Sequence, residues 1–468
     1  MTPMDRPALW MALAAVACAP LLAYFSSGAP EGTAVLIGAA ALLALAWPRP
    51  HWFMYGMVAG MFLPMLGVKL TLVYVDIGDL CAVFVGGVWV LALITGRRRP
   101  RLVRAAWVAP LYLIWCAITC ILGVAPQTAY GQLARLIMAG LAGLAIIDVA
   151  NSERRIRACL WICLLLAAGH AVAGIATANV GERPGGLFDQ PNSLGYYLGI
   201  GLFSGPGLQG EGDPRWRRVL VFALMGLIMV AIIATASRGA YLAVAAATIW
   251  YLRSSRRPVI AAGVIALIGA GALQFLGEDR EDLIERRLMF RDVSVPNRVI
   301  VLDNATTAIL KNPIFGVGYA QFDELRDAGE VVGQRGRSPH NLYASVAAST
   351  GLVGFVLFMI TGCVVVVPLF RLGKKQARER PTGQSLLRLV SSLETVVVFM
   401  VASVLTKGGG RLAFWSIWGL CGAVVLLVRD ERRQAARTVL SSEHAEITVV
   451  GQNRRSMAMA KTSTTRAW

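Results

Sequence analysis

The sequence predicts an all-α protein, a polytopic membrane bundle of about twelve to fourteen spans with one large polar loop between two of them. Composition is the first reason. Hydrophobic residues make up 56% of the chain and charged residues only 15%, and the mean hydropathy is +0.60, values typical of membrane bundles. The second reason is that apolar runs of about 20 residues, the length that crosses a bilayer as a helix, recur along the sequence.

The apolar runs define the expected spans, and together they predict a transmembrane bundle over residues 1–428. The first run has the outline of a signal peptide, but because a second run follows almost at once we expect an uncleaved span. Four short runs, 33–47, 52–66, 192–206 and 239–252, are also compatible with half-helices or re-entrant segments. The expected spans are 8–25, 33–47, 52–66, 77–95, 105–122, 131–149, 156–178, 192–206, 219–236, 239–252, 258–276, 341–370, 389–405 and 412–428.

The distribution of Lys and Arg predicts the orientation of the bundle. Cytoplasmic loops of membrane proteins are rich in these residues, and a cytoplasmic N-terminus places every strongly basic short loop on that side. We therefore expect both termini in the cytoplasm and the polar interval 277–340 on the far side of the membrane. In a Gram-negative bacterial cell, that membrane would be the inner membrane and the far side the periplasm. The net charge of +18 then reflects topology rather than nucleic-acid binding. The basic loops are 97–104, 154–157, 215–218, 253–257 and 371–388.

Two polar segments lie outside the expected spans. Within the large loop 277–340, apolar residues recur at helical spacing, and a short helix is expected over 299–310 that stops before Pro313. The tail 429–468 is polar and shows no clear period, so we expect a disordered cytoplasmic tail rather than one that contacts anionic lipid.

Arginines are the most informative residues on the predicted outer face. A guanidinium at the edge of a membrane bundle is costly unless it faces a cavity or finds a partner, and its fork of donors matches phosphate oxygens. Their convergence would favour a site for a phosphorylated, membrane-borne substrate. For Arg335 and Arg411 an interfacial or salt-bridge role is the favoured interpretation. The outer-face arginines are Arg183, Arg238, Arg298, Arg335, Arg337 and Arg411.

Few other residues are candidates for chemistry. His340 is the only histidine expected on the outer face outside the spans, and its reference pKa of about 6.5 makes it available as a base; a helix-capping or interfacial role is equally compatible. Asp76 and Asp79 suggest an acid–base pair, but a helix N-terminus explains them better. His170 lies mid-span and is expected to pack against a polar neighbour.

Metal and nucleotide chemistry find no support in the sequence. All eight cysteines fall in apolar runs and the four histidines are scattered, so neither a disulfide framework nor a metal site is predicted. No glycine-rich phosphate-binding motif is present, and no cofactor is expected.

Several motifs occur in a fixed order along the second half of the chain, and none is specific by itself. Their order and placement resemble the O-antigen ligase and polysaccharide polymerase superfamily over residues 183–370. The motifs are Arg183-x-x-Gly-x-Phe-x-x-Pro-Asn192, Ser237-Arg238-Gly239, Asn297-Arg298, Asn312-Pro-Ile-Phe-Gly-Val-Gly318, Pro339-His340-Asn341 and Gly351-x-x-Gly354.

The resemblance implies a glycosyltransferase-C-like fold and a metal-independent, inverting transfer from a polyprenyl-diphosphate carrier such as undecaprenyl diphosphate to a glycan or lipid acceptor. His340 would be the base, and Arg238 and Arg298 would hold the diphosphate. One departure is that Val299–Leu302 follows Arg298, where the family often has an aromatic residue. The residues expected to bind the diphosphate or glycan are Arg183, Asn192, Arg337 and Asn341.

Three functions remain open at this point. A ligase passes the glycan to a lipid or protein, as in lipopolysaccharide, whereas a polymerase passes it to another lipid-linked repeat, as in exopolysaccharide. The motifs are shared between the two. A transporter of lipid-linked saccharide is the alternative from another class; it should show intramembrane charges and repeated broken helices, and Arg135, Asp148 and Glu394 are its few candidates.

Overall fold

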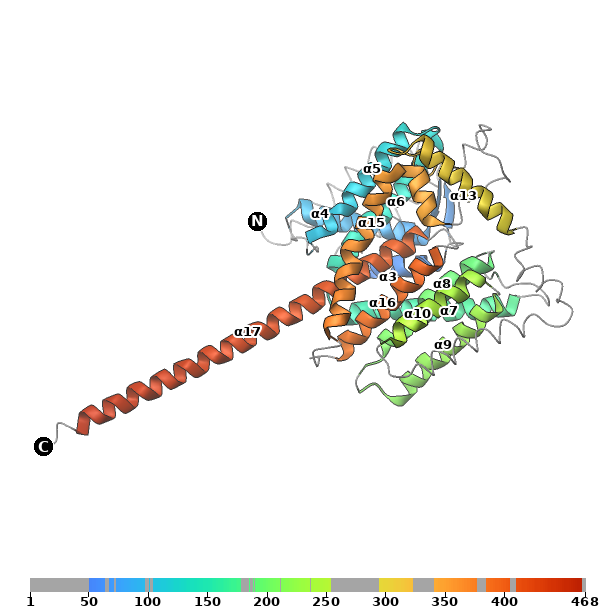
Figure 1. The fold of residues 1–468 in the computed structure, drawn as a ribbon. Helices are drawn as coiled ribbons and strands as arrows, with labels where there is room; N and C mark the ends of the chain where they lie inside the picture. The colour runs from blue at the N-terminus through green and yellow to red at the C-terminus, as the bar shows by residue number, and fades with distance from the viewer. Residues whose placement is uncertain are drawn as a thin grey trace, which may run out of the picture.

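The computed structural model of the chain shows a helical bundle with one antiparallel β-hairpin in its described part (Figure 1). The all-α, polytopic fold class is confirmed. The expected spans 8–25, 33–47 and 258–276 lie outside the described residues, as does the first part of the polar loop. The residues described are 50–63, 67–70, 73–96, 101, 104–177, 185, 188, 190–210, 212–235, 237–253, 294–322, 341–376, 384–404 and 410–464.

Each expected span that falls on described residues has a helix in its place. Seven helices of the described part, namely α4, α6, α7, α9, α15, α16 and α17, are long and apolar enough to cross a membrane, while α3, α8 and α10 are short, as their apolar runs predict. The helices are α3 (His51–Gly60), α4 (Ile77–Ile94), α5 (Val108–Leu122), α6 (Pro126–Val149), α7 (Glu153–Thr177), α8 (Pro191–Ser204), α9 (Arg215–Ala234), α10 (Arg238–Leu252), α13 (Ser294–Lys311), α15 (Leu342–Gln376), α16 (Gln384–Val404) and α17 (Arg411–Thr464).

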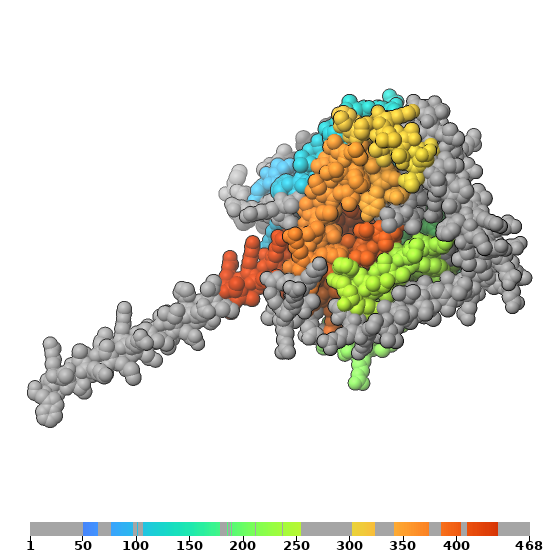
Figure 2. Space-filling view, viewed as in Figure 1, coloured from blue at the N-terminus to red at the C-terminus, as the bar shows by residue number. Residues whose placement is uncertain are grey.

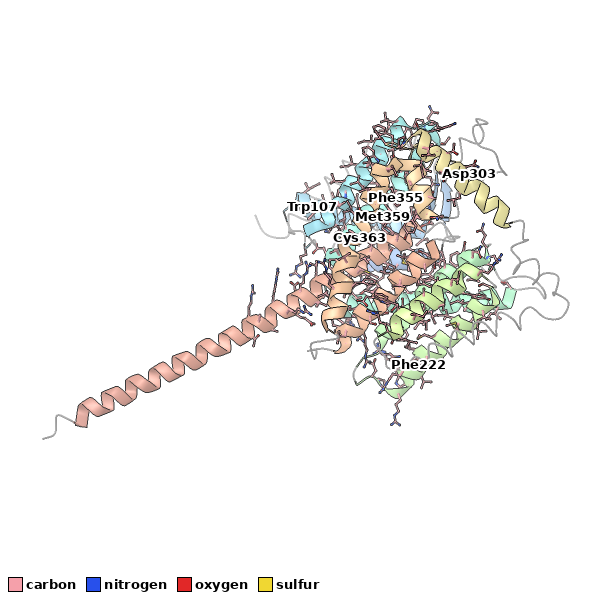
Figure 3. All side chains as sticks on the ribbon, viewed as in Figure 1. Trp107, Phe222, Asp303, Phe355, Met359 and Cys363 are labelled. Carbon is pink, nitrogen blue, oxygen red and sulfur yellow. The ribbon has the colours of Figure 1, made fainter. Side chains whose placement is uncertain are left out.

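The centre of the bundle is the contact between α6 and α17, which pack along each other. A side chain at Gly419 would place its Cβ 2.6 Å from the carbonyl oxygen of Gly143, so the two backbones touch here. Small residues permit such close approach of membrane helices. Large apolar side chains such as Trp107 and Phe222 instead lie on the outer surface, where they are 56% and 59% exposed (Figure 3). That distribution suits a bundle surrounded by lipid.

Helix α15 is kinked at Gly351, whose φ of 69° is left-handed, and the loop after α13 fits into the kink. Helix α13 ends before Pro313, as predicted, and packs against α15 (Figure 2). The amides of Val317 and Gly318 donate to the carbonyl oxygens of Ala348 and Ser349, at 2.9 and 3.0 Å. The Asn312–Gly318 motif therefore supports α15 through backbone hydrogen bonds at its kink.

Two features differ from the expectations. The tail was predicted to be disordered, but α17 continues to Thr464 and projects from the bundle (Figure 1). Residues 429–450 contain no Gly or Pro and many strong helix formers, so local propensity outweighs the missing apolar period. The hairpin of β1 (Gly67–Leu70) and β2 (Val73–Asp76) was not predicted, because its short strands fall between two apolar runs.

The loops predicted to be cytoplasmic meet at one end of the bundle. Arg157 donates to the carbonyl oxygen of Leu208 at 3.4 Å and to the hydroxyl of Ser385 at 2.6 Å. Arg388 donates to the carbonyl oxygen of Gln209 at 3.1 Å. The basic segments of Arg157 and Arg388 thus share one end with the loop that leads to the third, 215–218. The starts of α6, α8 and α10 lie at the other end.

Candidate functional site

A polar cavity of about 570 Å³ opens among the first turns of α4, α6, α15 and α17. Its volume lies in the range of ordinary ligand sites, about 300–1,000 Å³. The wall combines several charged or polar side chains with a set of aromatic rings. The polar side chains are Asp76, Gln132, Arg135, Ser345, Ser349 and Arg411, and the aromatic ones are Tyr112, Tyr197, Tyr319, Phe358, Phe414 and Trp415.

Asp76, which lines the cavity, and Asp79 behind it lie at the start of α4. Asp76 is the N-cap of α4, and its Oδ1 accepts a hydrogen bond of 2.7 Å from the amide of Asp79. Aspartate is favoured at this position because it satisfies an amide that has no partner within the helix and because it faces the positive end of the helix dipole. The helix N-terminus interpretation of both residues is confirmed.

Arg135 on α6 joins the two carboxylates. Its Nη2 lies 2.9 Å from Oδ2 of Asp76, and its Nε forms a short ion pair with Oδ2 of Asp79. The three side chains are only 17%, 7% and 4% exposed. Breaking a buried ion pair by removing one partner is strongly destabilising, so this cluster fixes α6 against α4 at the cavity.

Arg411, the first residue of α17, adds a second guanidinium to the cluster. Its Nη1 donates to Oε1 of Gln132 at 2.6 Å, and its Nη2 lies 3.9 Å from Oδ2 of Asp79. The salt-bridge interpretation of Arg411 is confirmed, and the structure adds that the residue lines the cavity. Two buried atoms of the cluster, Nε of Arg411 and Oδ1 of Asp79, have no hydrogen-bond partner among the described residues.

Tyr319 reaches the cavity from the loop after α13, which Gln321 anchors. The buried Gln321 side chain accepts from the amide of Ala125 at 2.6 Å and donates to the carbonyl oxygen of Cys120 at 2.7 Å. The loop is thereby tied to the turn between α5 and α6. Burial raises the pKa of the Tyr319 hydroxyl above its ordinary value, so Tyr319 faces the cavity as a neutral phenol.

Asn341 starts the fourth helix of the wall. Its Oδ1 accepts hydrogen bonds from the amides of Tyr343 and Ala344, at 3.0 and 3.3 Å, which makes it the N-cap of α15. Leu342 and Ser345, in the first turn of the same helix, line the cavity. The Pro339-His340-Asn341 motif therefore leads directly into the cavity wall, although His340 itself lies outside the described residues.

Two motifs far apart in the sequence meet at the start of α10. The hydroxyl of Ser237, the N-cap of that helix, donates to Oδ1 of Asn192 at 2.9 Å. Arg238 follows as the first residue of α10 and is exposed. Phe188, in the same motif as Asn192, stacks on Tyr197 at a centroid distance of 4.6 Å. Because Tyr197 lines the cavity, the motif pair is connected to its wall.

Of the residues predicted for the site, the structure describes the side chains of Asn192, Arg238 and Asn341. Arg183, Arg337 and His340 lie outside the described residues, and for Arg298 only the backbone, in α13, is described. Arg238 does not line the cavity within the described part. The convergence of Arg183, Arg238, Arg298 and His340 in one outward cavity remains a prediction.

The prediction missed the grouping of Arg135 and Arg411 with Asp76 and Asp79, of which Asp76 lines the cavity. One signal was available: an arginine inside one span and two aspartates at the start of another imply an ion pair, since an unpaired charge there is costly.

Other polar residues inside the bundle are paired with neighbours. His170 shares a hydrogen bond of 2.6 Å between its Nε2 and the carbonyl oxygen of Phe62, which confirms the expected packing against a polar group. Glu394 on α16 accepts from Arg253 at 2.5 Å. Two of the three charges considered for a transporter, Arg135 and Glu394, are thus held in ion pairs between helices. Within the described residues no group of three His, Cys, Asp or Glu side chains is placed to hold a metal.

Fold and cavity define a polytopic helical membrane protein with an ion-paired, aromatic cavity at one end of its bundle. Residues 220–359 match the family model described as O-antigen ligase. None of the curated proteins compared with the chain matches it. The resemblance to the O-antigen ligase superfamily is confirmed for this part of the chain, and the family supports a membrane glycan-transfer, ligase-like function. The charged cluster of Asp76, Asp79, Arg135 and Arg411 lies outside the matched stretch.

Proposed function

We propose that the protein is a glycosyltransferase that moves a glycan from a polyprenyl-diphosphate carrier to an acceptor hydroxyl on the periplasmic side of the bacterial inner membrane. One observation carries the proposal. The stretch that matches the O-antigen ligase family, 220–359, ends within α15, and the first turns of α15 form a wall of the polar cavity. The family's His-Asn motif, here His340-Asn341, thus leads into a chamber of suitable size.

The reaction follows from the residues of the motif set. His340 accepts the proton of the acceptor hydroxyl while that oxygen attacks the anomeric carbon of the donor sugar. The bond from this carbon to the carrier diphosphate breaks from the opposite side, so the anomeric centre inverts. Arg238 and Arg298 hold the diphosphate and neutralise the charge that grows on the leaving oxygen. Because guanidinium groups supply this charge, the proposed reaction needs no metal.

The arrangement around Arg238 supports its proposed role. It is exposed at the first position of α10, where the helix N-terminus favours anions. The hydrogen bond between Ser237 and Asn192 links this position to α8. We assign Asn192 and Asn341 to positioning the starts of α10 and α15, which in the sequence adjoin Arg238 and His340. For Arg183 and Arg337 we propose direct contacts with diphosphate or glycan.

An apolar pocket beside the cavity supports a lipid-linked substrate. The pocket, about 160 Å³, shares Leu342, Phe358 and Phe414 with the wall of the polar cavity. Two of its other lining residues, Met359 and Cys363, lie along α15 (Figure 3), and Cys363 is exposed. A polar chamber joined to an apolar pocket suits a substrate with a polar head and a hydrocarbon tail.

The proposed membrane arrangement follows the distribution of charge. The bundle spans residues 1–428, the region 183–370 carries the glycosyl transfer, and the loop 277–340 covers the periplasmic face. Both termini are cytoplasmic, with the tail 429–468 beyond the membrane. In support, the basic loop segments meet at one end of the bundle, and the cavity lies among helix starts at the other. Cysteine labelling from each side of the membrane tests this arrangement.

The acceptor is either a lipid or protein, as for a ligase, or another lipid-linked repeat, as for a polymerase. Deleting the protein in its host separates the two. Loss of ligation leaves long glycan stranded on the carrier lipid, whereas loss of polymerisation removes long glycan altogether.

Glycan transfer by the purified chain in detergent tests the enzymatic proposal against transport. No transmembrane gradient exists in detergent, so a protein that only moves lipid-linked saccharide across a bilayer forms no product there. We expect transfer that persists after treatment with a metal chelator. Absence of any transferred glycan, with the folded protein and a lipid-diphosphate-linked donor present, would contradict the proposal.

A further inference from the structure

We infer that a second, basic cleft of the bundle binds the phosphate of an anionic phospholipid, and that an acyl chain of this lipid follows the exposed face of α7. The cleft, of about 630 Å³, opens between α7, the start of α9 and the start of α16. It lies where the basic loop segments meet, at the opposite end of the bundle from the polar cavity. The inference does not depend on the transfer reaction.

The charges that line the cleft leave a positive excess. Three arginines and two acidic residues contribute to the lining, and both carboxylates are engaged within the protein. Glu153 accepts a hydrogen bond of 2.8 Å from Nε of Arg157, and Asp213 accepts one of 2.7 Å from Nη1 of Arg217. The charge of the third arginine, Arg154, is therefore not balanced within the lining. A ligand with a single negative charge matches this excess.

Arg154 offers a guanidinium that is accessible from the cleft. It is exposed, and it forms no hydrogen bond or ion pair with another described residue. Arg217 adds donors from the facing helix: its side chain is 28% exposed, and its guanidinium carbon lies 5.6 Å from the centre of the Trp161 ring. Phosphate oxygens accept readily from the N–H fork of arginine. The cleft thus presents guanidinium donors from α7 and α9 to one anion.

An apolar stripe on α7 begins in the cleft and leads away from it. Arg154, Ala158 and Trp161 line the cleft, and their spacing of four and three residues places them on one face of the helix. The same face continues through Leu165 and Val172, which are 51% and 54% exposed. A soluble anion gains nothing from such a surface, whereas a phospholipid carries an acyl chain directly beside its phosphate.

Aromatic residues place the cleft at the depth of lipid head groups. Tryptophan is enriched where a bilayer meets water, and Trp216, at the start of α9, is 67% exposed beside the cleft-lining Arg217. Phe222, farther along α9, lies on the outer surface (Figure 3). The proposed membrane arrangement places this end in the cytoplasm. Basic pockets between helices on that side typically bind anionic head groups.

Lipid binding to the purified full chain in neutral detergent, measured by native mass spectrometry, tests the inference. The probes are phosphatidylglycerol, the zwitterionic phosphatidylcholine, and glycerophosphoglycerol, which is the soluble head group of the first lipid. Arg154→Gln is compared with Arg215→Gln, which removes the same charge at an exposed position of α9 outside the cleft lining. Thermal unfolding establishes that each variant is folded.

We expect wild-type protein to bind phosphatidylglycerol more tightly than phosphatidylcholine. Arg154→Gln should bind phosphatidylglycerol roughly tenfold more weakly, the effect of losing a hydrogen bond to a charged group, and Arg215→Gln should bind it like wild type. Arg217→Gln should also weaken binding; if it fails to fold because Asp213 loses its partner, Arg154→Gln alone decides. Equal affinity of Arg154→Gln and Arg215→Gln for phosphatidylglycerol, or equal affinity of wild type for the two lipids, would overturn the inference.

Two further measurements separate a lipid from a free phosphate. Glycerophosphoglycerol should neither bind measurably nor displace the lipid, and an Arg154-dependent affinity equal to that of the lipid would replace the lipid by a soluble phosphate. Phosphatidylglycerol with a photoreactive group in one acyl chain should label α7 near Leu165, and labelling should fall in Arg154→Gln but not in Arg215→Gln. Labelling of α7 that is the same in both variants would overturn the proposed path of the acyl chain.

Discussion

The amide of Leu352 donates a hydrogen bond of 2.8 Å to the carbonyl oxygen of Pro313, across the kink that Gly351 makes in α15. The bond joins two motifs that the sequence shows only as separate glycine-containing stretches. Because the first turns of α15 line the cavity, this junction sets the position of the wall that follows His340. The motifs therefore support the site through backbone hydrogen bonds.

Substitution of Gly351 by Ala should destabilise the protein. The added Cβ would lie 2.0 Å from the carbonyl oxygen of Ile314, and the left-handed φ of 69° disfavours any side chain by roughly 1–3 kcal/mol. The matched control is Gly362→Ala in the same helix, where nothing lies within 4 Å of the new Cβ and a gain of about 0.5–1 kcal/mol is expected. Thermal unfolding in detergent measures the stability of both variants. Equal stability would contradict the claim that the Asn312–Gly318 loop supports α15 at its kink.

Removal of the guanidinium in Arg135→Leu should destabilise the bundle by about 3–5 kcal/mol. The buried carboxylates of Asp76 and Asp79 lose their hydrogen-bonded counter-charge, and only the more distant guanidinium of Arg411 remains near Asp79. Adding Asp76→Asn and Asp79→Asn to the same chain should restore much of the loss. Denaturant unfolding of the single and triple variants measures the effect. An unchanged stability in Arg135→Leu would show that the ion cluster does not hold α6 against α4.

Replacement of Gln321 by Leu should release the loop that carries Tyr319. The substitution leaves the Ala125 amide and the Cys120 carbonyl without their partner, at a cost of about 1–3 kcal/mol for the buried carbonyl. Glycan transfer should fall together with stability. Gln434→Leu, at an exposed position on α17, is the control and should match wild type in both measurements. Normal glycan transfer by Gln321→Leu would show that the reaction does not depend on the position of Tyr319.

The Asn192–Ser237 hydrogen bond should matter for activity more than for folding. Asn192→Leu removes the acceptor at the start of α10, and we expect up to roughly a tenfold loss in transfer rate, since a neutral hydrogen bond contributes about 0.5–1.5 kcal/mol. Asn192→Asp keeps an oxygen at Oδ1 and should retain most of the rate. If the two variants transfer glycan equally well, the link does not position Arg238.

Local patterns explain what the sequence predicted well. The spans followed from the lengths of apolar runs, and the end of α13 followed from Pro313, because hydropathy and proline act within a few residues of the chain. The cap of α4 was likewise predictable, since Asp76 and Asp79 belong to one helix turn.

Contacts between distant segments explain what the sequence could not predict. The pairing of Arg135 with two aspartates depends on how α6 packs against α4, and the fit of Gly316 to the α15 kink depends on φ angles of 67° and 69° in the two segments. For the same reason, the interfacial or salt-bridge role expected for Arg411 came without a partner residue. The helical continuation of α17 is a different case, in which the absence of an apolar period was given more weight than helix propensity.

The most direct test of the central claim is glycan transfer from a polyprenyl-diphosphate-linked donor by purified His340→Ala, measured beside wild type and Gln434→Leu. If His340 is the base of a membrane glycosyltransferase, wild type and Gln434→Leu form product and His340→Ala, folded and inserted normally, forms none. Full transfer by His340→Ala, or no transfer by the wild-type chain, would contradict the account.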